Sequence, residues 1–315
     1  MYFNLSTSAK DIIASHPRWI DPIKSKWLII AIFTLITNLS LLLTIVCRRN
    51  LRTLSNAVLC SMFICGSGYA LLFLIPGRVM ENWHQSSTSL LYIAATSGYI
   101  FTISYNLHLC VICACKILSL ISPLRHRVLL CRKNTIITIS VTWAISIILG
   151  PTPVLTDILY HYQNKPIRDY IIVQQMWHTV IFVLTIIIPI IFTLMLYIVA
   201  FIKINRRHRV TMLTVTRTSH KITQTYCVGR NLKLIKQMLV VLGLFTLCWL
   251  PYLIFVIIVK YMHTHTFIPF PLVQLVSRFS YLTLSYPAIN PILFAYYTIS
   301  IRNEIKILIT QYFKL

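Results

Sequence analysis

The amino-acid sequence predicts an all-α membrane protein, a seven-transmembrane helix bundle with a short cytoplasmic amphipathic helix after the last span. Of the 315 residues, 57% are hydrophobic and only 11% are charged, whereas a soluble domain carries about 25% charged residues. Seven apolar stretches reach the length of about 20 residues that a helix needs to cross a bilayer; they cover residues 27–47, 57–76, 90–115, 135–155, 171–200, 238–259 and 269–297. A water-soluble globule is therefore disfavoured.

Basic residues are distributed unequally between the two sides of this bundle. The chain has 29 Lys and Arg against 6 Asp and Glu, which gives a formal net charge of +23. One set of connections, with the segment after the last span, holds 20 basic residues and a single acid, Glu304, while the opposite set holds nine basic residues and five acids. Because cytoplasmic loops carry the excess of Lys and Arg, we expect an extracellular N-terminus, a cytoplasmic C-terminus and residence in the plasma membrane. Basic runs that alternate with apolar spans indicate contact with the lipid bilayer and no nucleic acid.

Short connections divide the chain simply. Residues 1–26 are expected to form an extracellular tail, residues 27–297 the bundle, and residues 298–315 the cytoplasmic amphipathic helix and C-terminus. The tail lacks a secretory h-region, so we expect the first span to be an uncleaved signal anchor. Asn4 opens an Asn-Leu-Ser glycosylation sequon in this tail, which agrees with the orientation.

The nine cysteines all fall within spans or on the predicted cytoplasmic side. Disulfides persist on the oxidising side of a membrane, so no extracellular disulfide is expected. Cys110, Cys113 and Cys115 lie close together in the sequence. A zinc site needs four ligands, however, and cysteine is common in apolar interiors, so neither a metal nor a cofactor is predicted.

Individual polar residues and prolines stand in a fixed order along the spans. They are Asn38 in the first span, Trp143 in the fourth, Pro189 and Tyr197 in the fifth, Phe245 and Cys248-Trp249-Leu250-Pro251 in the sixth, and Asn290-Pro291-Ile292-Leu293-Phe294 in the seventh. This series covers essentially the whole chain and resembles the rhodopsin-like (class A) G-protein-coupled receptors, of which the chain would be a divergent member. The sixth- and seventh-span motifs are its most specific parts.

The resemblance implies a cell-surface receptor that binds an extracellular ligand and signals through heterotrimeric G proteins. In such receptors the sixth span pivots at its proline, and Pro251 indeed lacks the N–H that would bond the carbonyl of Leu247. Trp249 would sense the ligand, although simple core packing is the alternative. The implied activation switch comprises Asn38, Pro189, Tyr197, Phe245, Trp249, Pro251, Asn290, Pro291 and Phe294.

At the cytoplasmic end the sequence departs from the family pattern. Where relatives have Asp-Arg-Tyr, this chain has Cys115-Lys116-Ile117, and the resemblance assigns these residues, with Pro123 and Lys233, to the surface that faces the G protein. Lysine keeps the positive charge but lacks the planar donor fork of arginine. With no acid at 115 and Asn231 at the base of the sixth helix, the usual ionic clasp of the inactive state is not expected. Raised basal activity and weakened coupling both remain open.

Three further departures concern the interior and the outer surface. Gly66 stands where the family has a sodium-binding Asp, so the resemblance predicts no sodium site. Leu91 stands near the usual start-of-third-helix Cys, and its partner loop also lacks Cys. Phe294 replaces the last Tyr of the seventh-span motif, removing a hydroxyl that relatives use in a network with Tyr197.

The resemblance places the ligand near Tyr99, Thr102 and Asn106 of the third span, or just above them. Tyr99, Thr102 and Asn106 fall on one face at helical spacing, and Trp249 and Tyr252 would close the floor. Arg278, an intramembrane charge, is by default a functional candidate for an anionic ligand, the alternative being an arginine that snorkels to the interface. No Lys lies between residues 269 and 297, so a retinal Schiff base is excluded. A small molecule, a lipid and a short peptide remain open.

Other classes of function fit the sequence less well. An enzyme is disfavoured because no paired carboxylates and no Gly-rich phosphate loop occur, and His108 and His178 are read as interior residues. A transporter would show inverted repeats and a midplane carboxylate, and neither is evident in this sequence. A receptor-like protein without conventional G-protein coupling stays as an alternative, and association into homo- or hetero-oligomers is left open.

Overall fold

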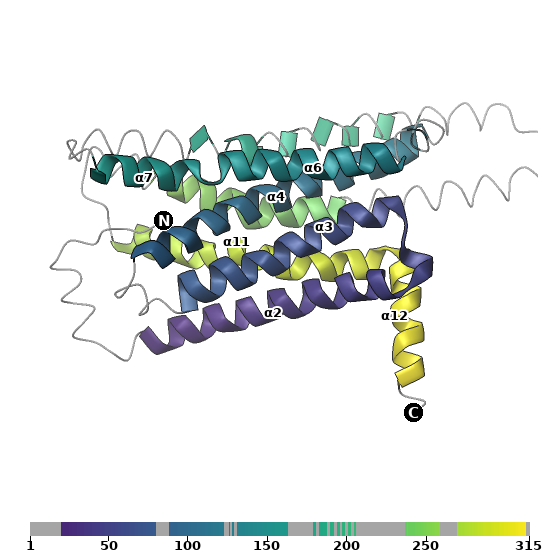
Figure 1. Ribbon diagram of the computed structural model, residues 1–315, viewed down its shortest axis with the longest axis horizontal. Coiled ribbons are helices and arrows are strands. Elements are labelled where there is room, and N and C mark those ends of the chain that lie inside the picture. The colour runs from purple at the N-terminus through teal and green to yellow at the C-terminus, as the bar shows by residue number, and fades with distance from the viewer. Residues whose placement is uncertain are drawn as a thin grey trace, which may run out of the picture.

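The computed structural model describes residues 20–79, 88–122, 131–162, 239–258 and 270–312, together with residues 126, 128, 179–180, 183–187, 190–191, 194–195, 197–198, 201–202, 205 and 237. The regular structure in these ranges is entirely helical. Figure 1 shows long helices lying side by side, with one short helix, α12, leaving the bundle at one end and running across the direction of the others. The prediction of an all-α bundle is confirmed for the described residues.

The helices follow the predicted spans closely. They are α2 (Ile20–Cys47), the 3-10 turn η2 (Arg49–Leu51), α3 (Leu54–Tyr69) continued by the π-helix η3 (Ala70–Val79), α4 (Thr88–Ile121), α6 (Arg132–Leu149), α7 (Thr152–Tyr162), the π-helical turn η5 (Val183–Ile187), α11 (Phe270–Tyr297) and α12 (Ile299–Tyr312). A further helix covers residues 239–258 and is called the sixth span below.

Five segments of the described chain are long and apolar enough to cross a membrane. They are Ser25–Cys47, Leu54–Val79, Ser89–Ser119, Arg132–Leu159 and Leu239–Ile258. Each coincides within a few residues with a predicted span, and α11 begins and ends within one residue of the predicted seventh span. The predicted fifth span, residues 171–200, lies largely outside the described residues.

Polar side chains lie inside this bundle and apolar side chains cover it. Asn38, His108 and Asn290 are 0% exposed, whereas Ile29 is 65% and Ile148 69% exposed. Such an arrangement would be costly in water, because exposed apolar area is what folding removes. In a bilayer the lipid solvates the outer face, and small or polar side chains join the helices. The exposed apolar surface is therefore the surface that contacts lipid.

Prolines interrupt several helices, and side chains take over the carbonyls that they release. A proline in an α-helix cannot donate to the carbonyl four residues before it, so Pro153 releases Leu149, while in the π-helix η3 the Leu72 carbonyl lies in the turn before Pro76. Ser97 Oγ on α4 donates to the Leu72 carbonyl at 2.7 Å, and Thr152 Oγ1 donates to Leu149 at 2.7 Å. These bonds supply the partners that the bilayer cannot. The broken helices can therefore stay within the membrane.

Candidate functional site

Asn38 connects the first and last long helices at a third proline break. Pro291 releases the carbonyl of Pro287, and Asn38 Nδ2 donates to that carbonyl at 2.9 Å and to the Thr34 carbonyl at 2.8 Å. The side chain is fully buried. The Asn38 amide on α2 thus supplies the hydrogen bond that the Pro287 carbonyl on α11 would otherwise lack. This bond explains why an Asn is stable at the middle of a span.

The space beside Asn38 is open to it because residue 66 has no side chain. A Cβ at Gly66 would lie 2.6 Å from Asn38 Cγ and 2.9 Å from its Nδ2, closer than real Cβ atoms come. Asn290 Nδ2 donates to Tyr105 Oη at 3.0 Å and lies 3.8 Å from Met62 Sδ. The Oδ1 atoms of Asn38 and Asn290 have no hydrogen-bond partner. The side-chain amide of Asn38 thus occupies the space beside Gly66, the position at which the family pattern has an Asp.

Aromatic rings connect this interior to Trp249. The ring centroids of Trp249 and Phe245 are 6.0 Å apart, those of Phe245 and Tyr286 5.3 Å, and those of Tyr286 and Tyr105 6.2 Å. All four rings are buried, and the two pairs that involve Tyr286 are edge-to-face, an arrangement that is favourable beyond the buried area. Because Tyr105 also accepts the hydrogen bond from Asn290, a continuous packed chain runs from Trp249 to the Asn-Pro break of α11.

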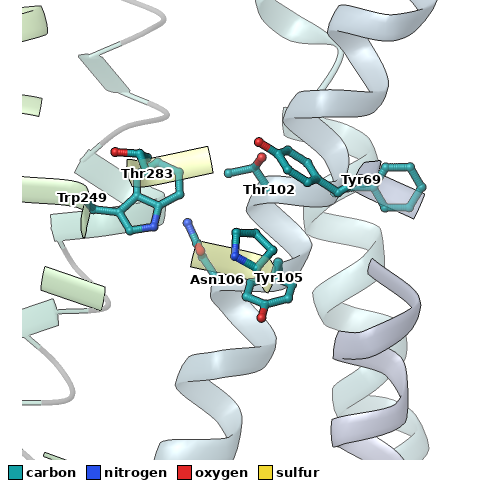
Figure 2. Close-up of a pocket in the computed structure, with 8 residues that line it drawn as sticks. Tyr69, Thr102, Tyr105, Asn106, Trp249 and Thr283 are labelled. Atoms are coloured by element: carbon teal, nitrogen blue, oxygen red, sulfur yellow. The ribbon is translucent and has the colours of Figure 1, made fainter. Parts of the chain in front are cut away.

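A small cavity lies against Trp249 (Figure 2). It is lined by Tyr69, Phe101, Thr102, Tyr105, Asn106, Trp249, Thr283 and Pro287. The volume of the cavity is about 10 Å³, which is about what one water molecule needs. A larger molecule would therefore have to displace side chains or enter only with a narrow polar group.

Four polar atoms on the cavity wall have no hydrogen-bond partner. They are Tyr69 Oη, Asn106 Nδ2 and Oδ1, and Trp249 Nε1. Their residues are only 3%, 1% and 7% exposed, respectively, and buried polar groups are nearly always bonded. Thr283, by contrast, uses its hydroxyl to donate to the Cys248 carbonyl at 2.6 Å, in the turn that precedes Pro251. The wall can therefore donate to and accept from a polar group placed between Asn106 and Trp249.

Of the predicted pocket residues, Thr102, Asn106 and Trp249 line the cavity together. Tyr99 and Tyr252 lie outside its lining, and Arg278 is exposed on α11. Sequence reasoning missed five lining residues, which are Tyr69, Phe101, Tyr105, Thr283 and Pro287. Phe101 and Tyr105 are four positions apart, so they share a helix face that adjoins the face of Thr102 and Asn106, and helical spacing could have indicated them as a second pair.

The remaining predicted positions divide into described and undescribed ones. Phe245, Asn290, Pro291 and Phe294 are buried between the cavity and the end of the bundle that carries α12, whereas Pro251 is half-buried and follows Trp249 in the sixth span, away from that end. Tyr197 is helical and half-buried, Cys115 is half-buried, and Ile117 is buried. Asn4, Pro123, Pro189 and Lys233 lie outside the described residues.

A hydrogen-bonded clasp joins three helices at the α12 end of the bundle. Lys116 Nζ on α4 donates to Gln237 Oε1 at 3.2 Å, and Gln237 Nε2 donates to Thr298 Oγ1 at 3.3 Å. Lys116 Nζ also lies 5.6 Å from the centroid of the Phe294 ring, within the range of a cation–π contact. The acid expected in such a clasp is absent, yet a neutral Gln that is 1% exposed holds the cation instead. Gln237 is a functional candidate that sequence reasoning missed.

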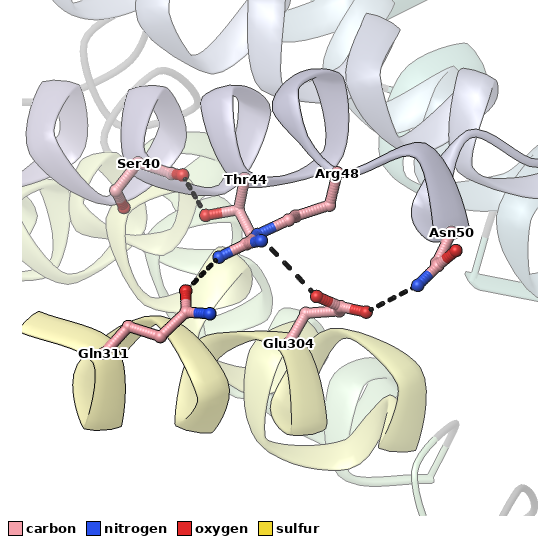
Figure 3. Close-up of polar contacts among 6 residues, drawn as sticks. All are labelled: Ser40, Thr44, Arg48, Asn50, Glu304 and Gln311. Atoms are coloured by element: carbon pink, nitrogen blue, oxygen red, sulfur yellow. Dashed lines mark hydrogen bonds and ion pairs between the residues drawn. The ribbon is translucent and has the colours of Figure 1, made fainter.

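A second polar contact attaches α12 to the end of α2 (Figure 3). Glu304 Oε2 lies 3.7 Å from Arg48 Nε, and Glu304 Oε1 accepts from Asn50 Nδ2 at 3.2 Å. Arg48 Nη2 also donates to Gln311 Oε1 at 3.0 Å. The contact fixes α12 across the end of the bundle, close to the Lys116 clasp through Thr298, the residue between α11 and α12.

Comparison with known proteins identifies the class of molecule. A family model described as 7 transmembrane receptor (rhodopsin family) matches residues 37–294, which is well over half of the chain and includes the stretch from Asn38 to Phe294. Among curated proteins, none matches. Members of this family are multi-pass membrane receptors without enzymatic activity. The chain therefore belongs to the rhodopsin family of seven-transmembrane receptors.

Proposed function

We propose that the protein is a plasma-membrane receptor that binds an extracellular small molecule, lipid or short peptide above Trp249 and signals through a heterotrimeric G protein. One observation carries this proposal. A cavity whose buried polar atoms lack partners adjoins the aromatic chain that leads through Tyr286 and Tyr105 to Asn290. A binding event in the cavity thus has packed neighbours through which it can act.

Trp249 and Gln237 both precede Pro251 in the chain, and in the proposed mechanism both belong to the segment that rotates about this proline. A ligand can shift an equilibrium only by binding the two states unequally. A polar ligand group that pairs with Asn106 and the Trp249 indole N–H would favour one position of the Trp249 ring. Rotation of the sixth span about Pro251 would then carry Gln237 away from Lys116. The freed cation would face the proposed G-protein site.

Charge supports the proposed orientation. Arg48, Arg49 and Arg52 follow α2, and Arg132 and Lys133 open α6, at the same end as α12. Cytoplasmic ends carry such excess positive charge. The proposal accordingly keeps residues 1–26 outside, with glycosylation at Asn4, and residues 298–315 inside.

The test is a cell-based measurement of G-protein dissociation with the full chain, run with and without small-molecule, lipid and peptide libraries. We expect at least one library to give a saturable response that Asn106→Leu abolishes at equal surface expression. Asn303→Leu, on an exposed position of α12, is the matched control and should respond as the wild type does. Responses that survive Asn106→Leu would place the ligand elsewhere and contradict the proposed site.

A receptor that binds ligand without activating G protein is the second candidate, and the Cys115-Lys116-Ile117 sequence favours it. In that case the wild type gives neither basal nor stimulated dissociation, and the double variant Cys115→Asp/Lys116→Arg gains it. Dissociation in the wild type rules this candidate out. The comparison needs only the same assay, because the wild type and the double variant carry the same ligand cavity.

A further inference from the structure

A second charged group besides Lys116 is fixed against aromatic rings, at the end of the bundle opposite α12. The guanidinium carbon of Arg78 lies 5.4 Å from the centroid of Trp27 and 5.9 Å from that of Phe73. Trp27 is itself stacked on Tyr281 of α11, with centroids 4.2 Å apart. Rings from α2, η3 and α11 thus form one platform for this side chain. Neither the sequence pattern nor the family match assigns a role to Arg78.

The π-helical geometry of η3 contributes to this placement. Phe73 and Arg78 are five residues apart, which is the hydrogen-bonding interval of a π-helix, so the wider turn brings their side chains together. Phe73 also packs against Tyr69, with ring centroids 5.2 Å apart, and Tyr69 lines the cavity. The Arg78 platform is therefore continuous with the cavity wall.

A guanidinium that stacks on rings through its face keeps its five N–H donors in the plane of the group. Among the residues that the structure describes, the carboxylate of Glu304 pairs with Arg48, and no carboxylate forms an ion pair with Arg78.

The Arg78 platform meets the cavity at Tyr69 of α3, whose ring packs against Phe73. The Tyr69 hydroxyl is buried and has no hydrogen-bond partner. An anionic group at this position would gain a guanidinium and an unused phenol donor, while the deeper cavity offers the amide of Asn106 and the indole N–H of Trp249.

We propose that Arg78 anchors the acidic group of the receptor's ligand, a carboxylate or a phosphate, and that the ligands are small organic anions with a second polar group directed toward Asn106. This inference rests on the proposed ligand cavity. It assigns the acid-binding role to Arg78 in η3 and not to Arg278, whose side chain is exposed on α11. Planar bidentate recognition of an oxyanion is the chemistry that arginine performs better than lysine.

The experiment uses purified full-length receptor in detergent and measures the shift of its melting temperature with defined probes. The probes are aliphatic and aryl monocarboxylates, each paired with its primary amide, and the corresponding phosphate monoesters, with inorganic phosphate as a separate arm. We expect acids, and not their amides, to raise the melting temperature. Arg78→Gln should weaken acid binding about ten- to hundredfold, and Arg278→Gln should leave it within about twofold.

Two more variants keep the proposal testable if Arg78→Gln destabilises the protein. Trp27→Leu retains the charge and removes the ring beneath it, so it should weaken acid binding less than Arg78→Gln does. Arg78→Glu should reverse the charge preference, so that alkylammonium probes bind better than carboxylates. Equal binding of acids and amides, no acid-dependent shift across the panel, or loss through Arg278→Gln would each overturn the anchor.

The same probes in the G-protein dissociation assay separate this inference from the proposed function. Acids that bind through Arg78 without any dissociation support the anchor and contradict the signalling proposal. Dissociation by neutral ligands that is insensitive to Arg78→Gln supports signalling and overturns the anchor. Binding of inorganic phosphate alone, without any organic acid, also overturns it.

Discussion

Breaking the Lys116–Gln237 clasp should raise the basal activity of the receptor. Gln237→Leu preserves the approximate volume of the side chain but removes the acceptor of Lys116 and the donor to Thr298. In the proposed mechanism the sixth span leaves this position on activation, so the two hydrogen bonds exist only in the resting state. Their loss therefore stabilises the active state relative to the resting state.

The expected size follows from the kinds of bond involved. A hydrogen bond to a charged donor contributes about 1.5–3 kcal/mol and a neutral one about 0.5–1.5 kcal/mol. Lys116 keeps its contact with Phe294, and water at the open end can solvate the cation in part, so we take about 1.5–3 kcal/mol as the net change. That is about a ten- to hundredfold shift toward the active state. A receptor active at about 0.1–1% without ligand would then become visibly active.

The assay is ligand-free G-protein dissociation, normalised to receptor at the cell surface. Thr298→Val removes only the neutral bond and should raise the baseline less. Gln237→Glu should lower the baseline, because a carboxylate pairs more strongly with Lys116 than an amide does. Gln274→Leu, at an exposed position of α11, is the matched control. The reasoning fails if Gln237→Leu leaves the baseline unchanged, or if Gln237→Glu raises it as much as Leu does.

Two further predictions concern stability and the position of α12. Asn38→Leu leaves the Pro287 carbonyl without its donor and should destabilise the bundle by about 1–3 kcal/mol, seen as a lower melting temperature in detergent than that of the control Asn303→Leu. Normal melting would contradict the role given to Asn38. Glu304→Gln weakens the contact with Arg48 and Asn50. Because this contact is partly exposed, it stabilises the fold by about 1 kcal/mol or less. Faster amide hydrogen exchange confined to α12 is expected, with Lys306→Gln as control, and unchanged exchange would argue against the contact.

Hydropathy and prolines predicted the bundle well because the bilayer imposes simple rules on sequence. A span needs an uninterrupted apolar stretch. The helix α11 begins and ends within one residue of its predicted stretch, whereas α2 begins earlier, at Ile20, and α4 ends later, at Ile121. Thr102 and Asn106 were predictable as pocket residues because α4 is a regular helix and four positions bring side chains to one face. Even on this regular helix the pattern was only partly sufficient, because the predicted Tyr99 lies outside the cavity lining and Phe101 and Tyr105 were missed.

Irregular backbone and helix rotation were not predictable in this way. Arg78 and Arg278 have similar sequence surroundings, an arginine near the outer end of an apolar span, yet one is half-buried on rings and the other exposed. Their difference depends on the π-helical turns of η3 and on the rotation of α11, whose apolar residues surround the helix and so do not indicate a buried face. Gln237 was missed because the family pattern directs attention to an acid, and a neutral amide at a helix end resembles any solvated polar residue.

The proline breaks suggest why motion would concentrate in the sixth span. Beside Pro76 and Pro291 a backbone carbonyl accepts a hydrogen bond from another helix, through Ser97 or Asn38. Each of those proline positions is therefore also hydrogen-bonded to a second helix, and bending there would break that hydrogen bond. Near Pro251 the inter-helix bond from Thr283 reaches the Cys248 carbonyl instead, and the side chain of Leu247 is 62% exposed toward the lipid side. The sixth span can thus rotate below Thr283 while the bond to Cys248 persists, and the resistance that remains is the clasp at Gln237. A ligand then has to contribute about as much differential binding energy as the clasp does, so clasp variants should lower the ligand concentration for half-maximal response in parallel with their basal activity.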